Sequence, residues 1–180
     1  ADLFSGISLG SSTITVSEAA DVDANFADSV ITEQRGDVLE ATVEVTQTDF
    51  AVVSFGSPDD GVEANATFED ENGDDEVTFY INTYNLQNGN DVFALDSDSD
   101  DSIRNQNNPI KAQDLVDAGD YDFEVEAGDI AYTTGVTESD DVATVTLEER
   151  STDNLRMWTG SSGQINSFSD LEDVNEALDE

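Results

Sequence analysis

The sequence predicts an all-β protein made of short antiparallel strands. In several stretches apolar residues recur at every second position, which is the period of a strand with one buried and one solvated face. Turn signals separate these stretches, among them Asn72-Gly73 and Asn88-Gly89. Hydrophobic residues make up 37% of the 180 residues, enough for the packed core of one domain.

Residues 1–28 are expected to form an N-terminal arm and a polar linker. The arm holds one strand-like stretch, Ser12 to Ser17, in which Ile14 and Val16 lie on one face. Together with Ile7 and Leu9 they are candidates for a strand used in self-assembly. Such a strand either pairs within its own sheet or is donated to a neighbouring copy. The sequence leaves both alternatives open.

Residues 29–160 are expected to fold as an antiparallel β-sandwich of the immunoglobulin-like kind, with about six to nine strands. An antiparallel barrel is the alternative. A dense apolar run covers residues 50–57, and the phase of the stretch 38–45 is broken near Leu39. The residues predicted to face the core are Val38, Ala41, Val43, Val45, Val62, Ala64, Ala66, Phe68, Val77, Phe79, Ile81, Thr83, Tyr121, Phe123, Val125, Ala143, Val145 and Leu147.

Two stretches depart from the period of two. Residues 108–119 predict a short helix that ends at Gly119. Residues 161–180 are expected to form a linker and a C-terminal helix, because Ser169 and Glu172 stand at capping-box spacing before a helical apolar stripe. We expect this helix to continue beyond Glu180 in a longer protein.

The charge balance indicates a protein adapted to concentrated salt. Forty-three acidic residues face five basic ones, a formal net charge of −38. Such a field repels nucleic acid and anionic membranes, and it strains a compact fold unless salt screens it. At molar salt the Debye length falls to about 3 Å. An acidic cation-binding protein in ordinary salt is the alternative. No apolar run approaches the length of a membrane-spanning helix.

The residue types present argue against an enzyme. The chain has no histidine, no cysteine and a single lysine, so the common general bases, nucleophile pairs and soft metal ligands lack their partners. No phosphate loop or dinucleotide fingerprint is found. No catalytic residue and no firm cofactor is therefore predicted.

Weak calcium binding is the one cofactor hypothesis that the acidic loops support. Asp70, Asn72 and Asp74 have the spacing that begins a calcium loop, although an Asn-Gly hairpin turn with acids beside it is the preferred interpretation. A second acidic loop supplies hard oxygen ligands without a defined geometry, and a solvated loop is its simpler interpretation: Asp96, Asp98 and Asp100.

Three further features bear on binding. Asn65-Ala66-Thr67 is an N-glycosylation sequon, and strand alternation predicts that Asn65 faces solvent. Trp158 is interpreted as a core or strand-edge aromatic rather than a sugar platform. Arg35-Gly36-Asp37 has the letters of an adhesion signal, but Gly36 more simply supplies a turn before the next strand.

Several stretches together carry a family resemblance. "VITEQRGDV" (30–38), "LVDAGDYDFEV" (115–125), "DVATVTLEERST" (141–152) and "DLEDVNEAL" (170–178) resemble the haloarchaeal cell-surface glycoproteins, which are S-layer-like secreted proteins with immunoglobulin-like domains. The resemblance covers about residues 26–180. It implies an exported, surface-anchored and often glycosylated structural protein, and it transfers no catalytic residue.

The sequence thus predicts a non-enzymatic structural protein of the archaeal cell surface, with its signal peptide removed. Its partner would be itself, in a pilus-like filament with strand donation or in a surface layer. The alternative is an adhesion module that binds cations or carbohydrate.

Overall fold

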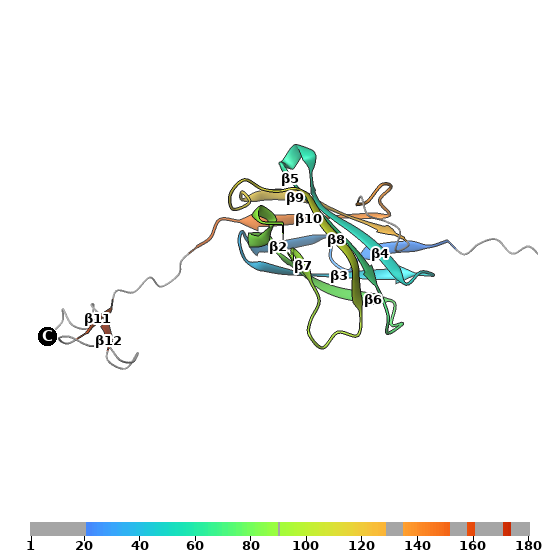
Figure 1. The fold of residues 1–180 in the computed structure, drawn as a ribbon, viewed down its shortest axis with the longest axis horizontal. Coiled ribbons are helices and arrows are strands. Elements are labelled where there is room, and N and C mark those ends of the chain that lie inside the picture. The colour runs from blue at the N-terminus through green and yellow to red at the C-terminus, as the bar shows by residue number, and fades with distance from the viewer. Residues whose placement is uncertain (1–20, 90, 129–134, 152–157, 161–170, 174–180) are drawn as a thin grey trace, which may run out of the picture.

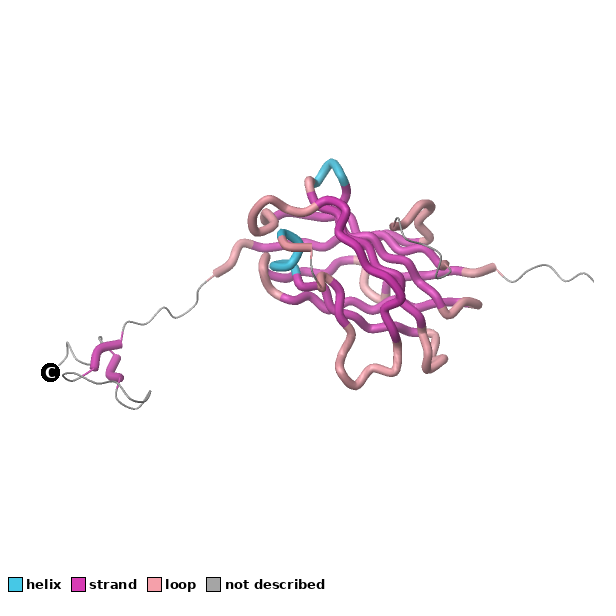
Figure 2. The backbone as a smooth tube through the Cα atoms, viewed as in Figure 1, coloured by secondary structure: helices cyan, strands magenta, loops and turns pink. Residues whose placement is uncertain are grey.

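The protein folds as two β-sheets packed face to face (Figures 1 and 2). The computed structural model describes residues 21–89, 91–128, 135–151, 158–160 and 171–173. The all-β prediction is confirmed, because the described residues form strands β1–β12 and only two short 3₁₀-helices, η1 (Pro58–Asp60) and η2 (Thr83–Gln87). None of the described helices is long and apolar enough to cross a membrane.

The smaller sheet has four antiparallel strands in the order β1-β3-β6-β7. Alternation holds along β3, where Leu39, Ala41, Val43 and Val45 are buried. The prediction for Val38 is wrong, since its side chain is 50% exposed and Leu39 takes the inward position. The strands are β1 (Asp23–Phe26), β3 (Val38–Thr46), β6 (Glu76–Asn82) and β7 (Phe93–Ala94).

The larger sheet has six strands in the order β2-β10-β9-β4-β5-β8. One pair, β2 with β10, is parallel, so the purely antiparallel prediction needs correction. The cause is the switch from β1 in one sheet to β2 in the other after only three linking residues. The strands are β2 (Val30–Gln34), β4 (Phe50–Ser57), β5 (Val62–Glu69), β8 (Ser102–Ile110), β9 (Gly119–Ala127) and β10 (Asp141–Glu148).

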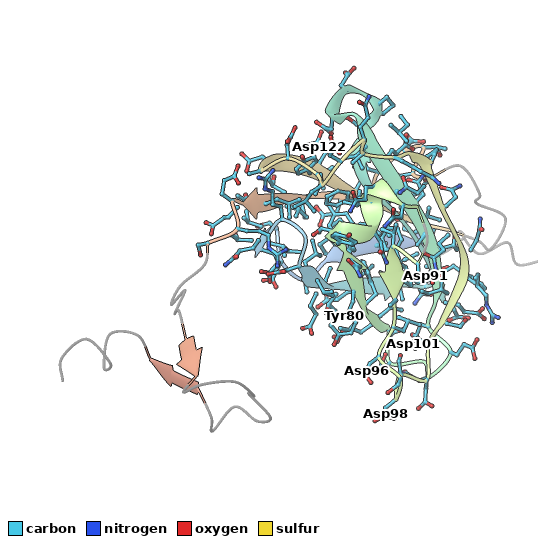
Figure 3. The ribbon with its side chains drawn as sticks, turned by 60° about the vertical axis from the view of Figure 1, so that its left-hand side comes forward. Tyr80, Asp91, Asp96, Asp98, Asp101 and Asp122 are labelled. Carbon is cyan, nitrogen blue, oxygen red and sulfur yellow. The ribbon has the colours of Figure 1, made fainter. Side chains whose placement is uncertain are left out.

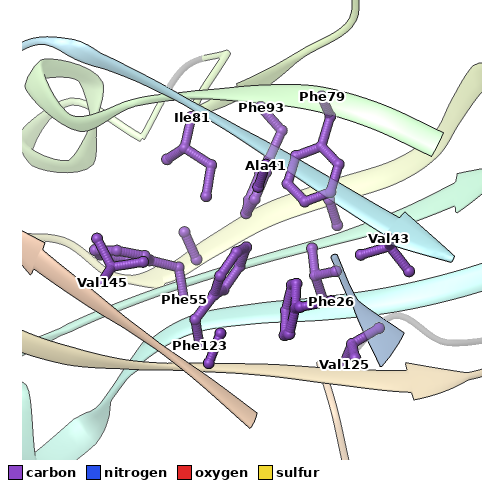
Figure 4. Close-up of a cluster of buried hydrophobic side chains, with 14 of the residues drawn as sticks. Phe26, Ala41, Val43, Phe55, Phe79, Ile81, Phe93, Phe123, Val125 and Val145 are labelled. Carbon is purple, nitrogen blue, oxygen red and sulfur yellow. The ribbon is translucent and has the colours of Figure 1, made fainter. Parts of the chain in front are cut away.

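The core lies between the sheets and is rich in aromatic rings (Figure 4). Phe26 of the smaller sheet meets Phe123 of the larger one with ring centroids 4.4 Å apart, and Phe68 meets Phe79 at 4.3 Å. Burying each ring contributes about 1.5–3 kcal/mol. Apart from Val38, every core-facing residue predicted from alternation is buried.

Both predicted helices need correction. Asn108 to Ile110 complete strand β8, where Ile110 pairs with Glu63 of β5, and the stretch that follows to Gly119 is not helical. At the C-terminus, β12 (Leu171–Asp173) pairs with β11 (Trp158–Gly160), so these residues satisfy their backbone groups in a ladder rather than a helix. The rest of the predicted helix lies outside the described residues, as do residues 1–20 of the arm.

The body of two sheets has distinct ends, and the chain passes from one to the other. Strand β1 begins beside the end of β3, where Asp23 pairs with Thr46, and we call this the leading end. Strand β10 finishes beside the end of β2, where Glu148 pairs with Gln34, and we call this the trailing end. Figure 1 shows these two ends at opposite extremes of the body.

Candidate functional site

The first acidic loop, at the leading end, is a turn held by its own carboxylates. Asp70 is 4% exposed, and its two oxygens accept hydrogen bonds from the backbone N–H groups of Gly73 (2.7 Å) and Asp75 (2.8 Å). Asn72 Oδ1 accepts from the N–H of Asp74 at 2.8 Å. The oxygens expected to bind calcium therefore already serve the turn between β5 and β6.

The second acidic loop extends from the body between β7 and β8 (Figure 3). Asp96 Oδ1 accepts from the N–H of Asp98 at 2.9 Å, which is again a local turn contact. Asp96, Asp98 and Asp100 are exposed. Within the described part of the chain, no group of three or more acidic side chains has the arrangement of a metal site.

Asp101 stands where the two acidic loops approach each other. Burial raises the pKa of its carboxyl, and the charges of Asp70 and Asp74 raise this pKa further. Hydrogen bonds from Ser99 and from the backbone of Glu71 act in the opposite direction. The two loops therefore repel each other when all their carboxyls are ionised.

Asn65, the sequon residue, is buried, which overturns the prediction that it faces solvent. Its side chain is 3% exposed, and its Nδ2 donates to Glu63 Oε1 at 3.1 Å and to Asn107 Oδ1 at 3.2 Å. A Cβ on Gly135 would lie only 2.6 Å from Asn65 Oδ1. Gly135 therefore lies directly against the Asn65 side chain.

The described residues that follow Gly135 are held by a buried glutamate. Glu126 on β9 is 8% exposed, and its Oε2 accepts from the N–H groups of Thr137 (2.7 Å) and Glu138 (3.2 Å). One step along, the N–H of Val136 donates to Ser54 Oγ at 2.8 Å. These contacts close the outer face of the larger sheet over Ser54 and Asn65.

The Arg35-Gly36-Asp37 stretch is the turn between β2 and β3 at the trailing end, as predicted. Gly36 has a φ of +87°, and its N–H donates to Thr83 Oγ1 at 2.7 Å. Arg35 pairs with Glu149 at 2.7 Å, and Arg150 donates to Asp37 Oδ1 at 3.2 Å. Both charged side chains of the tripeptide are therefore used within the domain.

The edges of the two body sheets are the remaining candidate surface, and three of these four edges are short or occupied. β1 has four residues, and the N–H of Phe26 is bonded to Asp141. β7 has two residues, and Gln106 of β8 bonds both the N–H and the carbonyl of Phe93. On β2, the N–H of Gln34 is capped by Glu33.

The fourth edge, β8, is different. It spans nine residues, Ser102 to Ile110, and contains no acidic residue. Among described strands longer than three residues, only the central β4 shares this lack of acids. Acidic and cationic side chains normally protect an edge from pairing with another chain. β8 carries one charge, that of Arg104, which is paired with Glu69 and Glu71.

Sequence reasoning missed Glu126, Ser54 and Gln106, because each bonds a partner outside its own strand, from 11 positions away for Glu126 to 82 for Ser54. The uncharged run "NQNN" (105–108) in so acidic a chain was a signal for the β8 edge. No local signal points to Glu126, which is one acid among many. The arm residues Ile7, Leu9, Ile14 and Val16 lie outside the described residues.

Residues 16–128 match a family described as a domain of unknown function, DUF7827. The chain belongs to the DUF7827 family. The similarity to individual haloarchaeal proteins extends beyond residues 16–128. A protein of Haloferax gibbonsii called "Cell surface glycoprotein" is 40% identical over 178 residues, which are 99% of this chain and 20% of that protein.

Two proteins of Haloarcula hispanica are also similar to this DUF7827 member. "Cell surface glycoprotein 1" is 35% identical and "Cell surface glycoprotein 2" is 33% identical, and each match covers 87% of this chain and 18% of the relative. The resemblance to haloarchaeal cell-surface glycoproteins is confirmed. The chain spans about a fifth of the length of the curated relatives it matches.

Proposed function

We propose that this chain is a non-enzymatic structural domain of the haloarchaeal cell surface, located outside the cell and assembled in high salt. The observation that carries the proposal is the 40% identity, over 99% of the chain, to a protein called a cell surface glycoprotein. The net charge of −38 supports it, because such a surface is suited to brine. The matched family and relatives carry no enzyme name.

We further infer that the two-sheet body is an immunoglobulin-like sandwich. The opening strand is divided between the sheets as β1 and β2, and the last strand of the body, β10, lies between β2 and β9. Sheets of six and four strands make the body one strand larger than the nine-stranded variable-type sandwich. Such domains serve as rigid building blocks in many cell-surface proteins.

The positions of the leading and trailing ends support an end-to-end arrangement. The chain enters and leaves the body at opposite extremes. A pulling force applied to the two ends would therefore act along the strands rather than across them. A domain of this kind acts as a link, either between copies in a filament or layer, or between domains of a longer surface protein.

In the filament version, the arm around Ile14 and Val16 adds a strand to the sheet of a neighbouring copy. The stretch from Leu9 to Ser17 carries no charge, so its approach to another acidic copy is not opposed by repulsion. In a continuous strand, Ile7 and Leu9 would lie on the opposite face from Ile14 and Val16, because their positions are odd and not even.

Sedimentation velocity of the full chain in molar KCl tests the proposed assembly. Wild-type protein should form species that grow with protein concentration. Ile14→Asp should return the chain to the monomer without changing its circular dichroism, whereas Ser12→Asn serves as a control in the same arm. A wild-type chain that stays monomeric at every concentration and salt level would contradict the proposal.

A further inference from the structure

We infer that strand β8 is the edge that receives the donated arm, so that residues 12–17 of one copy extend the six-stranded sheet of another. This inference rests on the proposed function, since it names the surface that such assembly would use. It follows from the chemistry of the four sheet edges and from the part of the core that lies beside β8.

Length is the first reason. An added strand needs a row of backbone groups to pair with, and β1, β2 and β7 span only four, five and two residues. β8 offers seven residues, Ser102 to Asn108, before Pro109, which has no N–H to donate. The arm stretch from Ser12 to Ser17 has six residues and fits this length.

Charge is the second reason. Nearly every exposed strand of this domain carries carboxylates that would repel an incoming acidic copy, and β8 carries none. Of the two cations near this edge, Arg104 in β8 offsets Glu69 and Glu71 of the neighbouring segment, and Lys111 follows β8 directly. An uncharged arm and an acid-free edge are therefore matched to each other.

Incomplete cover of the core is the third reason. Four hydrophobic side chains of the described residues pack against the core while remaining partly exposed, and three of them lie along the β7–β8 rim: Leu95, Ile103 and Ala112. A strand added outside β8 would place Ile14 and Val16 on the inner face, beside Ile103. Covering apolar surface in this way favours pairing in any salt.

The arm's own β8 is a poor alternative. In the smaller sheet, β1 and β7 occupy opposite edges, and β7 is the one bonded to β8 through Gln106. To pair outside its own β8, the arm must cross four strand spacings, about 19 Å, and the gap of about 10 Å between the two sheets. The segment from Ser17 to Asp23 spans only about 20 Å when fully extended. A second copy receives the arm without that path.

Cysteine cross-linking in the full chain tests the inference, and the natural absence of cysteine gives a clean background. In the proposed pairing, Thr13→Cys and Thr15→Cys would place thiols on the face opposite Ile14 and Val16. Arg104→Cys places one at an exposed position of β8. Each arm variant is mixed with Arg104→Cys in molar KCl and oxidised. Thr32→Cys, exposed on the β2 edge, is the matched control.

We expect a disulfide between arm and β8 variants and none with Thr32→Cys. Adding Ile14→Asp to the arm variant should lower the cross-link at least about tenfold, because the burial of one aliphatic side chain is lost. Equal cross-linking to Thr32→Cys would overturn the inference, and so would a cross-link formed only within one chain of the Thr15→Cys/Arg104→Cys double variant.

The same samples distinguish failure of the β8 assignment from failure of the proposed function. If assemblies form in sedimentation but the arm and β8 do not cross-link, the β8 assignment is overturned and the proposed function stands. Samples that neither assemble nor cross-link would contradict both.

Discussion

Replacing Gly36 with valine tests whether the Arg-Gly-Asp stretch serves as a turn that stabilises the fold. Gly36 has a φ of +87°, a conformation that costs a residue with a side chain about 1–2 kcal/mol, and valine more than most. A Cβ there would lie 3.1 Å from Leu115 Cδ1, and such crowding typically costs a further ~1–3 kcal/mol. Gly36→Val should therefore lower the free energy of unfolding by about 2–5 kcal/mol.

Urea unfolding in molar KCl, followed by circular dichroism, measures this loss. Gly61→Val is the matched control, because Gly61 has a φ of +72° but no atom within 4 Å of the added Cβ. It should lose only the conformational part, about 1–2 kcal/mol. Asp37→Glu should lose less than about 1 kcal/mol, since its ion pair with Arg150 is exposed and screened. Equal losses for Gly36→Val and Gly61→Val, or a larger loss for Asp37→Glu, would refute the reasoning.

Three further predictions concern the acids. Asp70→Ala should lower the free energy of unfolding by about 2–3 kcal/mol in urea titrations, because two backbone N–H groups lose a charged acceptor. Calorimetry of wild type with CaCl₂ should then show no saturable heat, and a stoichiometric heat lost in Asp70→Ala would contradict this assignment. Asp101 has a raised pKa, so its ionisation opposes folding, and wild type loses stability as pH rises through that pKa. Asp101→Asn should be more stable than wild type at pH 7 and no more stable below the ordinary aspartate pKa of about 3.9, as urea unfolding at both pH values will show. The melting temperature should fall steeply below about 1 M KCl, and a melting temperature independent of salt would contradict the adaptation to brine.

Alternation predicted the core well because both sheets bury one face of each strand. Val77, Phe79 and Ile81 occupy the interior as the period of two requires. The break near Leu39 was resolved by the register of β3 with β6, where Leu39 pairs with Ile81. Residues 108–119 misled because the spacing of Leu115 and Val116 is local, whereas the pairing of β8 with β5 is set by residues some forty positions earlier.

The sites were harder to predict because the sequence does not show which groups contact each candidate side chain. Alternation predicts that Asn65 faces solvent, because the residues near it in sequence do not indicate that Gly135 covers it. Asp70 was found from its spacing, but its role follows from the backbone N–H groups that point at it. In both cases the sequence supplies the residue, and the three-dimensional contacts decide what it does.

Electron microscopy of the purified full chain in molar KCl tests the central claim most directly. If the chain is a self-assembling surface domain, the images should show filaments or sheets with a regular repeat, and Ile14→Asp should show only single bodies. Wild-type images that contain only single bodies, at concentrations where the fold is intact, would contradict the claim.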